Sequence, residues 1–350
     1  MDARFDVAVV GGGPAGATAA LVLARSGLRV GVLEAGRYEH PRPGETLPPS
    51  AKALLRRLGL GHACSPPVAG PSYGNRSAWE RSEPEATPFL LHPHGDGLHV
   101  DRQAFDRLLA ETAAGAGAEL LDGARVRACW ASGGGMRVRL ADGRNIAAAA
   151  VIDATGRSAR IARMCGARRR IDDRLIAIAR DYACDAGDAW TLVEAVEGGW
   201  WYSATVPGDR LVTIFVTDAD LWGRGWDVAL AAAPLTRARI GTARPRGGTR
   251  AWSALSHRLE FRAPAARVVA VGDAAMAKDP LAADGLVWAL LSGEAGALAL
   301  AHHLLGRDDP GVQYERWLDG AFEAYRHERR AVYARQTRWA DAPFWRRRRA

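Results

Sequence analysis

The chain has 350 residues, of which 48% are hydrophobic and 25% are charged, and this is ordinary for a globular enzyme of one large or two modest domains. Its formal net charge is +8, and the run Arg346 to Arg349 supplies four of those charges. We interpret this run as a solvated tail. Because the rest of the chain has no recognised binding module and no alternation of aromatic and basic residues, the composition does not predict a nucleic-acid partner.

The cysteines and the apolar segments restrict the compartment. The four cysteines are widely spaced, without a C-x-x-C pair: Cys64, Cys129, Cys165 and Cys184. This spacing argues against a zinc site or a disulfide framework and suits a reducing compartment. The first strand begins near residue 5, so no signal peptide is predicted. The most apolar stretch, 286–305, is interrupted by Glu294, His302 and His303, so no membrane span is predicted and we expect a cytoplasmic protein.

The N-terminal segment matches the fingerprint of a dinucleotide-binding turn. An apolar run of strand length, 6–10, precedes Gly11, Gly13 and Gly16, and a helix is predicted over 15–28. Gly11 permits a tight turn, Gly13 lets the backbone approach a pyrophosphate, and Gly16 lets the helix pack closely on the strand. The N-terminus of the helix supplies unpaired N–H groups and a partial positive charge for the phosphates.

The strand predicted next, over 28–33, ends at Glu34, which lies 18 residues after Gly16. A carboxylate at this offset accepts hydrogen bonds from ribose hydroxyls and disfavours a 2′-phosphate on the adenosine. The alternative is a glycine-rich strand, turn and helix without a ligand. Because the strand, the three glycines, the helix, the second strand and the acid occur in order, we favour a dinucleotide site.

A second glycine-bearing pattern lies near the other end of the chain. A strand predicted over 268–271 is followed by Gly272 and Asp273, whose carboxylate can accept a hydrogen bond from a ribityl hydroxyl. Pro280 then leads into a helix predicted over 285–305, whose free N–H groups would stabilise negative charge at the pyrimidine edge of a reduced flavin. The two patterns together predict that one discontinuous domain holds one dinucleotide, FAD, at both ends.

The segments between the two patterns are predicted to contain short strands and one helix. The helix is expected over 100–121, with Asp101 as its N-cap. Asp142-Gly143 is typical of a hairpin turn between two strands. Strands and turns are expected over 76–99, and strands over 125–130, 136–140 and 151–156.

Residues 175–218 have the pattern of an antiparallel meander. Four strand-like runs, separated by turns at 185–188, 197–199 and 207–209, are 175–183, 190–196, 199–206 and 210–217. A helix is expected over 225–240 and another over 311–340. The second carries a stripe that we interpret as core packing, formed by Tyr314, Trp317, Leu318, Phe322 and Tyr325.

These elements predict an α/β fold with α+β character in its second domain. A Rossmann-like FAD-binding domain is interleaved with an antiparallel-sheet substrate domain and followed by a C-terminal helix. We assign the FAD-binding domain to 1–75, 100–170 and 265–310, the substrate domain to 76–99 and 171–264, and a C-terminal helical segment with a basic tail to 311–350. The second sheet is expected to cover the cofactor.

In these features the chain resembles the p-hydroxybenzoate-hydroxylase-like flavoproteins over nearly its whole length. The resemblance is carried by Gly11 to Gly16, Glu34, Asp101 to Leu108, Asp153 to Arg157, Gly272-Asp273, Pro280 and Gly285. It implies that Arg102 lies near the FAD ribose or phosphates, Val126 beside the adenine and Asp273 on the ribityl chain. The full set expected around FAD is Gly11, Gly13, Pro14, Ala15, Gly16, Glu34, Ala35, Arg42, Glu45, Thr46, Arg102, Val126, Gly272, Asp273, Pro280, Gly285 and Leu286.

Within that superfamily the chain most resembles the branch of flavin-dependent halogenases, prenyl reductases and quinone-cofactor maturation enzymes. The segment Pro43 to Leu47 resembles that branch's loop near the flavin ring. The segment Trp200 to Ala204, with the closing Arg338-Trp339 and Phe344-Trp345, resembles the maturation flavoproteins, which hydroxylate a tryptophan within a partner polypeptide.

The departures from this branch concern halogenation and the electron source. Halogenases capture hypohalous acid on a lysine in the segment that corresponds to 70–90, whereas the two lysines here are Lys52, on a predicted helix, and Lys278, after the Gly-Asp pattern. Their Trp-x-Trp-x-Ile-Pro motif is replaced by the residues from Trp200 to Pro207. The Asp-Gly element of NAD(P)H-dependent hydroxylases is matched only in part, by Asp153-Ala-Thr-Gly156. Electrons are therefore expected from NAD(P)H or from a separate flavin reductase.

The substrate side carries candidates but no assigned catalytic base. His92 and His94 alternate, so they would share one face of a strand, where a histidine can exchange a proton with an aromatic N–H or O–H; otherwise they are surface residues. Trp201 and Tyr202 fit either a binding surface or the core of a sheet. No third ligand accompanies the two histidines, so no metal site is predicted.

Three functions remain open from the sequence. The first is an FAD-dependent monooxygenase that hydroxylates an aromatic group, either a small molecule or a Trp or Tyr side chain of a peptide or partner protein. The second is a halogenase or an isoprenoid reductase that acts on a small molecule. The third is a flavin-loaded assembly protein without turnover. The fold alone does not choose between them.

Overall fold

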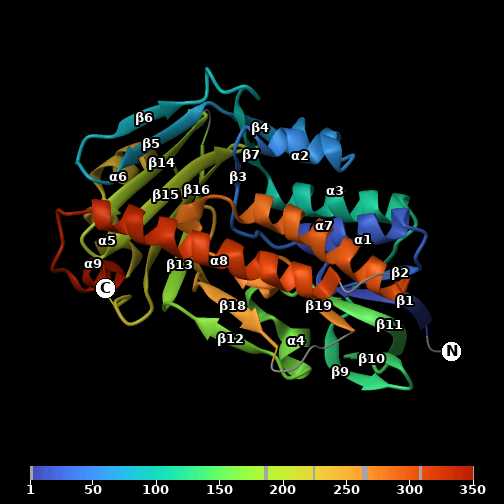
Figure 1. Cartoon of the computed structure of the whole chain (residues 1–350). Coiled ribbons are helices and arrows are strands. Elements are labelled where there is room, and N and C mark those ends of the chain that lie inside the picture. The colour runs from blue at the N-terminus through green and yellow to red at the C-terminus, as the bar shows by residue number, and fades with distance from the viewer. Residues whose placement is uncertain (1–2, 185–187, 224, 262–266, 307–309, 350) are drawn as a thin grey trace.

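The computed structural model describes residues 3–184, 188–223, 225–261, 267–306 and 310–349, and these form four sheets with helices packed around them (Figure 1). Part of the turn predicted at 185–188 lies outside the described residues. The helices are α1 Pro14–Arg25, α2 Ala51–Arg57, α3 Arg102–Gly115, α4 Arg160–Met164, α5 Trp226–Ala231, α6 Pro234–Ile240, α7 Gly285–Leu304, α8 Pro310–Arg335 and α9 Pro343–Arg349. Short 3₁₀ turns are η1 Gly61–Cys64, η2 Gly156–Ser158, η3 Gly272–Ala274 and η4 Pro280–Ala282.

The first sheet brings segments that are far apart in the sequence to one edge. Its strands are β1 Ala3–Val10, β2 Val30–Glu34, β8 Glu119–Asp122, β9 Val126–Ser132, β10 Gly135–Leu140, β11 Asn145–Asp153 and β19 Val268–Ala270. The order is β8-β2-β1-β11-β10-β9, and β19 pairs in parallel with the last residues of β11. Because β1, β2, β11 and β19 are parallel, the residues that follow them meet at the same edge.

The predicted elements of this domain are confirmed in type, with shifted ends. The Asp142-Gly143 turn joins β10 to β11, which pair as antiparallel strands. The helix predicted over 100–121 ends at Gly115, and the residues after Ala118 form β8 at the sheet edge. Asp101 is its N-cap, because the carboxylate accepts from the N–H groups of Gln103 and Ala104 at 3.0 and 2.9 Å.

Helices α1, α3 and α7 pack together over the first sheet, and α8 lies against α7 (Figure 1). Gly293 of α7 admits α1 closely, because a Cβ atom there would lie 2.4 Å from the carbonyl oxygen of Ala15. By length and composition α7 is apolar enough to cross a membrane, but 56% of its most apolar window is buried inside the molecule. That burial is typical of a core helix.

The second sheet is the antiparallel meander that the sequence predicts. Its strands are β5 Gly74–Ala78, β6 Glu85–Pro88, β13 Leu175–Ala183, β14 Trp190–Val196, β15 Gly199–Val206, β16 Arg210–Asp218 and β17 Arg250–Ser253. The order is β17-β13-β16-β15-β14-β5-β6, with one parallel pair between β14 and β5. Smaller sheets join β3 Thr46–Leu47, β4 Ala69–Ser72 and β7 Gly97–Val100, and β12 Arg168–Ile171, β18 His257–Glu260 and β20 Met276–Ala277.

The helix predicted over 225–240 is divided into α5 and α6. The chain leaves α5 after Ala231, and Pro234 begins α6 because proline favours the first turn of a helix. Periodicity alone does not show this break, since apolar residues continue through it. Both helices cover Trp201 and Phe215 on one face of the second sheet.

The C-terminal arginines are not a solvated tail, and this corrects the interpretation above. They belong to α9, which packs against α8 and buries Phe344 and Trp345 beside Trp79 and Trp200. Arg348 is buried in an ion pair with Asp218, and Arg347 pairs with Asp218 and Asp220 (side-chain N to O, 2.8 and 2.7 Å). The acidic end of β16 therefore holds this basic helix in place.

The aromatic stripe of the C-terminal helix is core packing, as predicted. The side chains of Tyr314, Leu318, Phe322 and Tyr325 are buried against the first sheet's cluster. The exception is Trp317, which is 39% exposed and stacks on Trp288 of α7, with ring centroids 4.9 Å apart. The helix itself ends at Arg335, short of the predicted 340.

Candidate functional site

The turn between β1 and α1 needs its glycines for two different reasons. Gly11 has φ +104°, and a Cβ atom there would lie 2.3 Å from the carbonyl oxygen of Ala154. A Cβ on Gly16 would lie 1.9 Å from the carbonyl oxygen of Gly11. These two glycines are thus required by the fold itself, at the contact between helix and strand.

Gly13 differs from its neighbours. Its φ of −71° suits any residue, and a Cβ atom there would meet only the Arg42 guanidinium at 3.5 Å. The space beside Gly13 is therefore a cradle that side chains of the described residues leave open, at the N-terminus of α1. The N–H groups of Ala15 and Gly16 in this first turn have no preceding helical carbonyl to bind, and this suits a pyrophosphate.

Glu34, at the end of β2, closes one side of this cradle. Its Oε2 accepts from the N–H of Gly12 at 2.6 Å, and its Oε1 accepts from Gly36 N–H at 2.9 Å and from Arg42 Nη2 at 3.2 Å. The next residue, Ala35, is exposed. The carboxylate is thus fixed at the offset expected for a ribose acceptor, with Arg42 beside it.

Arg42 and Arg102 converge on one buried carboxylate, Asp106. Arg42 Nη1 lies 3.2 Å from Asp106 Oδ2, and Arg102 binds both oxygens from Nε and Nη2 at 3.0 and 3.1 Å. Arg102 also donates to the carbonyl oxygens of Pro43 and Gly44. This network fixes the loop 43–47 to α3. Asp106 received no role from the sequence, although its spacing of four from Arg102 on a helix indicates an ion pair.

The loop 43–47 presents a buried acid, Glu45. Burial raises the pKa of its carboxyl to about 7, although the charges of Arg102 and Arg210 oppose the shift, and Gly44 N–H donates to Oε2 at 3.0 Å. A carboxyl that titrates near neutrality can hold or release a proton during a reaction. Glu45 is therefore a buried, titratable carboxyl in the loop that the resemblance implies lies near the flavin ring.

Thr46 joins this loop to the second sheet. Its Oγ1 lies 2.6 Å from the Tyr202 hydroxyl and 3.5 Å from Thr191 Oγ1. Thr191 Oγ1 in turn lies 3.1 Å from Nε2 of His99, which is fully buried. Burial lowers the pKa of His99 to about 4, so its ring is neutral near pH 7. The sequence did not single out His99 or Thr191, because neither belongs to a spacing motif.

Tyr202 and Trp201 lie on opposite faces of β15, as neighbours on a strand must. Trp201 is fully buried between Phe215 and Trp226, with ring centroids 4.9 and 4.8 Å away, on the face covered by α5 and α6. Tyr202 faces Thr46. The structure thus brings Tyr202 to the loop near the predicted flavin and assigns Trp201 to core packing.

His92 and His94 do not share a strand face, and this corrects the expectation. They lie in turns between β6 and β7, where His94 is exposed and His92 half-buried. Their rings are 5.6 Å apart between centroids, and the His94 N–H donates to His92 Nδ1 at 3.2 Å. The run Gly95-Asp-Gly97 and Pro93 interrupt the alternation that a strand requires.

The second glycine pattern meets the first at the same sheet edge. Gly272 has φ +59°, and a Cβ atom there would lie 2.7 Å from the Cβ of Ala15 in α1. Asp273 is half-buried and pairs with Arg157, Nη1 to Oδ2 3.4 Å. Asp273 directly follows Gly272, the residue that lies against α1. Val126, predicted beside the adenine, is buried at the start of β9.

Asp153 is engaged within the fold. Its Oδ1 accepts from the N–H and hydroxyl of Thr155 at 2.9 and 2.6 Å, and its Oδ2 accepts from the N–H of Ala162 at 2.7 Å. These bonds fix the turn after β11 and the start of α4. The partial Asp-Gly element thus has a structural role in this chain.

The N-terminus of α7 lies beside a buried acid, Asp279. Pro280 and Gly285 are exposed, and Leu286 is buried. Asp279 accepts from Leu281 N–H at 2.9 Å and from the Tyr333 hydroxyl at 2.7 Å, and its own N–H donates to the Tyr325 hydroxyl at 2.8 Å. Helix α8 therefore holds the loop that precedes α7. Lys278 in this loop pairs with Asp284 and lies 5.0 Å from the centroid of the Trp288 ring.

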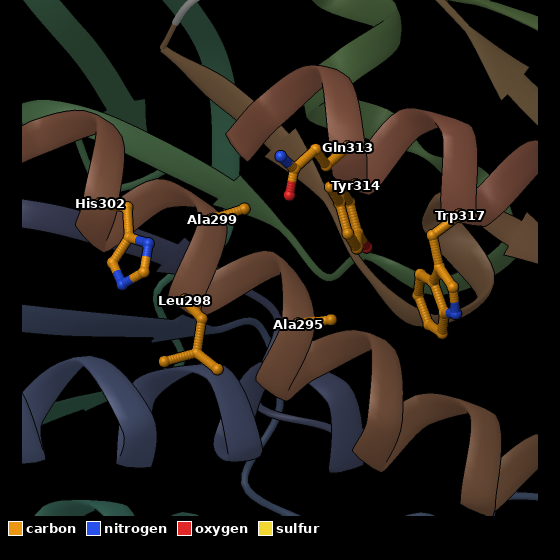
Figure 2. Close-up of a pocket in the computed structure, with 7 residues that line it drawn as sticks. All are labelled: Ala295, Leu298, Ala299, His302, Gln313, Tyr314 and Trp317. Atoms are coloured by element: carbon orange, nitrogen blue, oxygen red, sulfur yellow. The ribbon is translucent and has the colours of Figure 1, made fainter. Parts of the chain in front are cut away.

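An apolar cavity of about 260 Å³ lies elsewhere, between α7 and α8 (Figure 2). Its lining is Ala295, Leu298, Ala299, His302, Gln313, Tyr314 and Trp317. None of these residues is among those predicted to bind FAD. Among the described residues, no three His, Cys, Asp or Glu side chains gather closely enough to hold a metal ion.

The parallel sheet, the glycine cradle and the acid at the end of β2 define a protein that binds the adenine dinucleotide of a flavin. A model of the FAD binding domain family matches residues 4–209, more than half of the chain, and the chain belongs to this family. It is an FAD-dependent oxidoreductase of the superfamily branch that the sequence predicted.

Relatives match nearly the whole chain. The Marinomonas mediterranea protein LodB, named as an FAD-dependent oxidoreductase, is 26% identical over 99% of this chain and 97% of its own length. The flavin-dependent halogenase CmlS has a TM-score of 0.86 at 26% identity and covers 100% of this chain and 68% of its own. The peptidyl tryptophan dihydroxylase QhpG has a TM-score of 0.79 at 24% identity and covers 99% and 79%.

Proposed function

We propose that this oxidoreductase is a monooxygenase that hydroxylates an aromatic group, and that the group is a Trp or Tyr side chain of a peptide or partner protein. Support comes from full-length similarity to LodB and from the likeness to QhpG, which is described as essential for tryptophylquinone cofactor biogenesis. The observation that carries the proposal is the contact between the loop 43–47 and the second sheet through Thr46 and Tyr202.

FAD, when bound, supplies the redox chemistry and the activation of oxygen. The chain's own residues would bind the cofactor and orient the substrate. The cradle at Gly13 takes the pyrophosphate, Glu34 the ribose and Asp273 the ribityl chain. The second sheet, with Tyr202 and buried His99, closes the loop 43–47 against solvent. Excluding water limits side reactions and strengthens every charge interaction within the site.

We propose that Glu45 is the base that accepts a proton from the substrate. Its pKa of about 7 leaves a substantial fraction of the carboxylate ionised at neutral pH, so it can accept a proton from an aromatic N–H or O–H as the new bond forms. Tyr202 and Thr46 would orient the aromatic ring nearby through their hydroxyl groups.

Halogenation is the second candidate, and one observation favours it. The amine of Lys278 lies in the loop that leads into α7, beside Asp284 and the Trp288 ring, and CmlS is a close structural likeness. The ion pair with Asp284 already engages this amine, so we rank hydroxylation first. An isoprenoid reductase and a flavin-loaded assembly protein are left as alternatives.

The experiment combines the FAD-loaded protein with a flavin reductase, NADH and oxygen, and offers N-acetyl-tryptophanamide or a Trp-containing peptide. Mass spectrometry that finds one or two added oxygen atoms supports the proposal. A parallel reaction with chloride and bromide tests the second candidate, because halogen incorporation there, without added oxygen, contradicts hydroxylation. Absence of any product, with oxygen consumption no higher than that of the reductase alone, would favour the assembly protein.

A further inference from the structure

The positive charge of the chain is concentrated in two segments. Residues 157–174 contain seven arginines and two aspartates, and residues 326–349 contain nine arginines and two carboxylates. Their combined excess is larger than the net charge of +8 for the whole chain, so the remainder is net negative. Where the two segments meet, the second contributes the arginines and the first contributes Ile171 and Asp172. Clustered positive charge attracts anions.

The two segments meet at a cavity of about 270 Å³ between the end of β12, the C-terminal half of α8 and α9. The lining residues are Ile171, Asp172, Arg326, Arg329, Arg330, Arg347 and Arg348. Five guanidinium groups therefore face one carboxylate. This lining is chemically unlike the apolar cavity between α7 and α8, and no residue predicted to bind FAD belongs to it.

Carboxylates of the fold anchor four of the five arginines. Arg326 Nε lies 2.9 Å from Asp172 Oδ2, and Arg329 Nη1 lies 2.9 Å from Asp173 Oδ2. Arg347 and Arg348 both bind Asp218, as described above. Anchored side chains lose little further freedom when a ligand binds, so the set is organised in advance.

Arg330 is the exception. It is exposed and makes no hydrogen bond or ion pair with any described residue. In addition, Nε of the buried Arg348 has no hydrogen-bond partner among the described residues. The cavity thus retains donor capacity that the surrounding carboxylates do not use. A buried unpaired donor is costly, and a ligand oxygen would relieve that cost.

We propose that this cavity binds a phosphoryl group, either as inorganic phosphate or diphosphate or as the phosphate of a small organic molecule. Guanidinium groups match phosphate oxygens in planar pairs of hydrogen bonds. A phosphoryl group offers several oxygens to the donors that remain, on Arg330 and on Nε of Arg348, whereas a carboxylate offers only two. The proposal does not depend on the reaction proposed above.

Hydrogen bonds connect this cavity to the loop that precedes α7. Arg329 Nη1 also lies 3.4 Å from Ser256 Oγ, and Ser256 Oγ lies 2.6 Å from the Tyr325 hydroxyl. That hydroxyl accepts from the N–H of Asp279, the residue before Pro280. One continuous set of hydrogen bonds therefore joins the cavity to the loop that precedes α7.

The test is isothermal titration calorimetry of the full FAD-loaded chain with sodium diphosphate in a chloride buffer of constant ionic strength. Loading with FAD keeps the glycine cradle occupied, so that diphosphate does not bind there. We expect one saturable site that Arg330→Gln weakens at least roughly tenfold, since one charged hydrogen-bonding group is lost. The matched control is Arg346→Gln, an exposed arginine of α9 outside the lining, which should leave the affinity unchanged.

Two further ligands distinguish the sources and the alternatives. Tighter binding of phenyl phosphate than of diphosphate supports an organic phosphate, and the reverse order supports the free anion. No saturable heat with either compound overturns the proposal, and so does an equal weakening by Arg330→Gln and Arg346→Gln, because both outcomes reduce the effect to general charge attraction. Binding of hexaglutamate alone also overturns it and indicates an acidic protein surface instead.

Discussion

The fold does not require a glycine at position 13, whereas a bound pyrophosphate would. Because its φ is negative and a Cβ atom would meet only the Arg42 guanidinium at 3.5 Å, a side chain there fits the protein without FAD. We expect Gly13→Val to fold normally and to lose bound flavin at least roughly tenfold, since the branched side chain fills the cradle. Flavin absorbance per protein after gel filtration, together with circular dichroism, measures both effects.

The matched control is Gly16→Val. A Cβ atom there would overlap the carbonyl oxygen of Gly11, so this variant should lose about 1–3 kcal/mol or more of folding stability even without flavin. Equal flavin content in Gly13→Val and the parent protein would show that the cradle is not the pyrophosphate site.

Glu45 gives the molecule a pH-dependent stability. Burial raises the pKa of this carboxyl from 4.5 to about 7, so the folded state binds its proton more tightly than the unfolded state does. The sign follows from linkage: the contribution to stability is lost as pH rises from about 4.5 to about 7. Removing the group by Glu45→Gln should therefore raise the relative unfolding free energy by about 3 kcal/mol between pH 4.5 and pH 7.5.

Urea unfolding of the FAD-loaded parent and variant at several pH values measures this difference. Glu197→Gln, an exposed carboxyl in the turn before β15, is the control and should change little with pH. A flat difference between Glu45→Gln and the parent would mean that Glu45 titrates normally, and its proposed role as a base near neutrality would fail with it.

At the scale of elements, helix α9 depends on the acidic end of β16. Asp218 binds both Arg347 and Arg348, so Asp218→Asn leaves the buried Arg348 without its counter-charge, whereas Arg347 keeps Asp220. We expect a loss of about 3 kcal/mol in the free energy of unfolding, as for other broken buried pairs. Equilibrium urea unfolding, followed by the fluorescence of the Trp79, Trp200 and Trp345 cluster, measures it.

Asp220→Asn provides the comparison, because Asp220 binds only Arg347 and is exposed. It should change stability little. If the two variants lose the same stability, the pair between Asp218 and Arg348 does not hold α9 in place.

The elements that the sequence predicted well are those whose signals are local. Asp101 as an N-cap, the Asp142-Gly143 hairpin and the four strands of the meander depend on neighbouring residues. The errors came where a local pattern meets a distant partner. The sequence after Trp345 is typical of a solvated run, because it does not show that the fold places Asp218 beside Arg348. The alternation of His92 and His94 predicts a strand, but Pro93 and Gly95 favour turns at these positions.

At the scale of the whole molecule, the candidate site is formed by residues that lie far apart in the sequence. Four parallel strands that are far apart in the sequence bring Gly11, Glu34, Asp153 and Gly272 to one edge, and a glycine spacing is enough to predict that edge. The contact of Thr46 with Tyr202, 156 residues apart, and the buried His99 behind it have no such spacing. These contacts depend on how the sheet of β3, β7 and β4 packs on the second sheet, so a single sequence does not reveal them.

This architecture also predicts how electrons arrive. The chain has one glycine fingerprint after a strand, and the carboxylate of Asp153 is bound by Thr155 and Ala162 within the turn after β11. Little remains in the described residues to recognise a second dinucleotide, so we expect NADH and NADPH alone to leave the bound flavin oxidised for minutes. Anaerobic titration, followed by the visible absorbance of the flavin, is the measurement.

Dithionite, or NADH with a flavin reductase, should bleach the same sample, which shows that the bound flavin is reducible. Prompt bleaching by NADPH alone would instead make the protein a self-sufficient oxygenase, and Asp153→Asn would then show whether the turn after β11 takes part in that reduction.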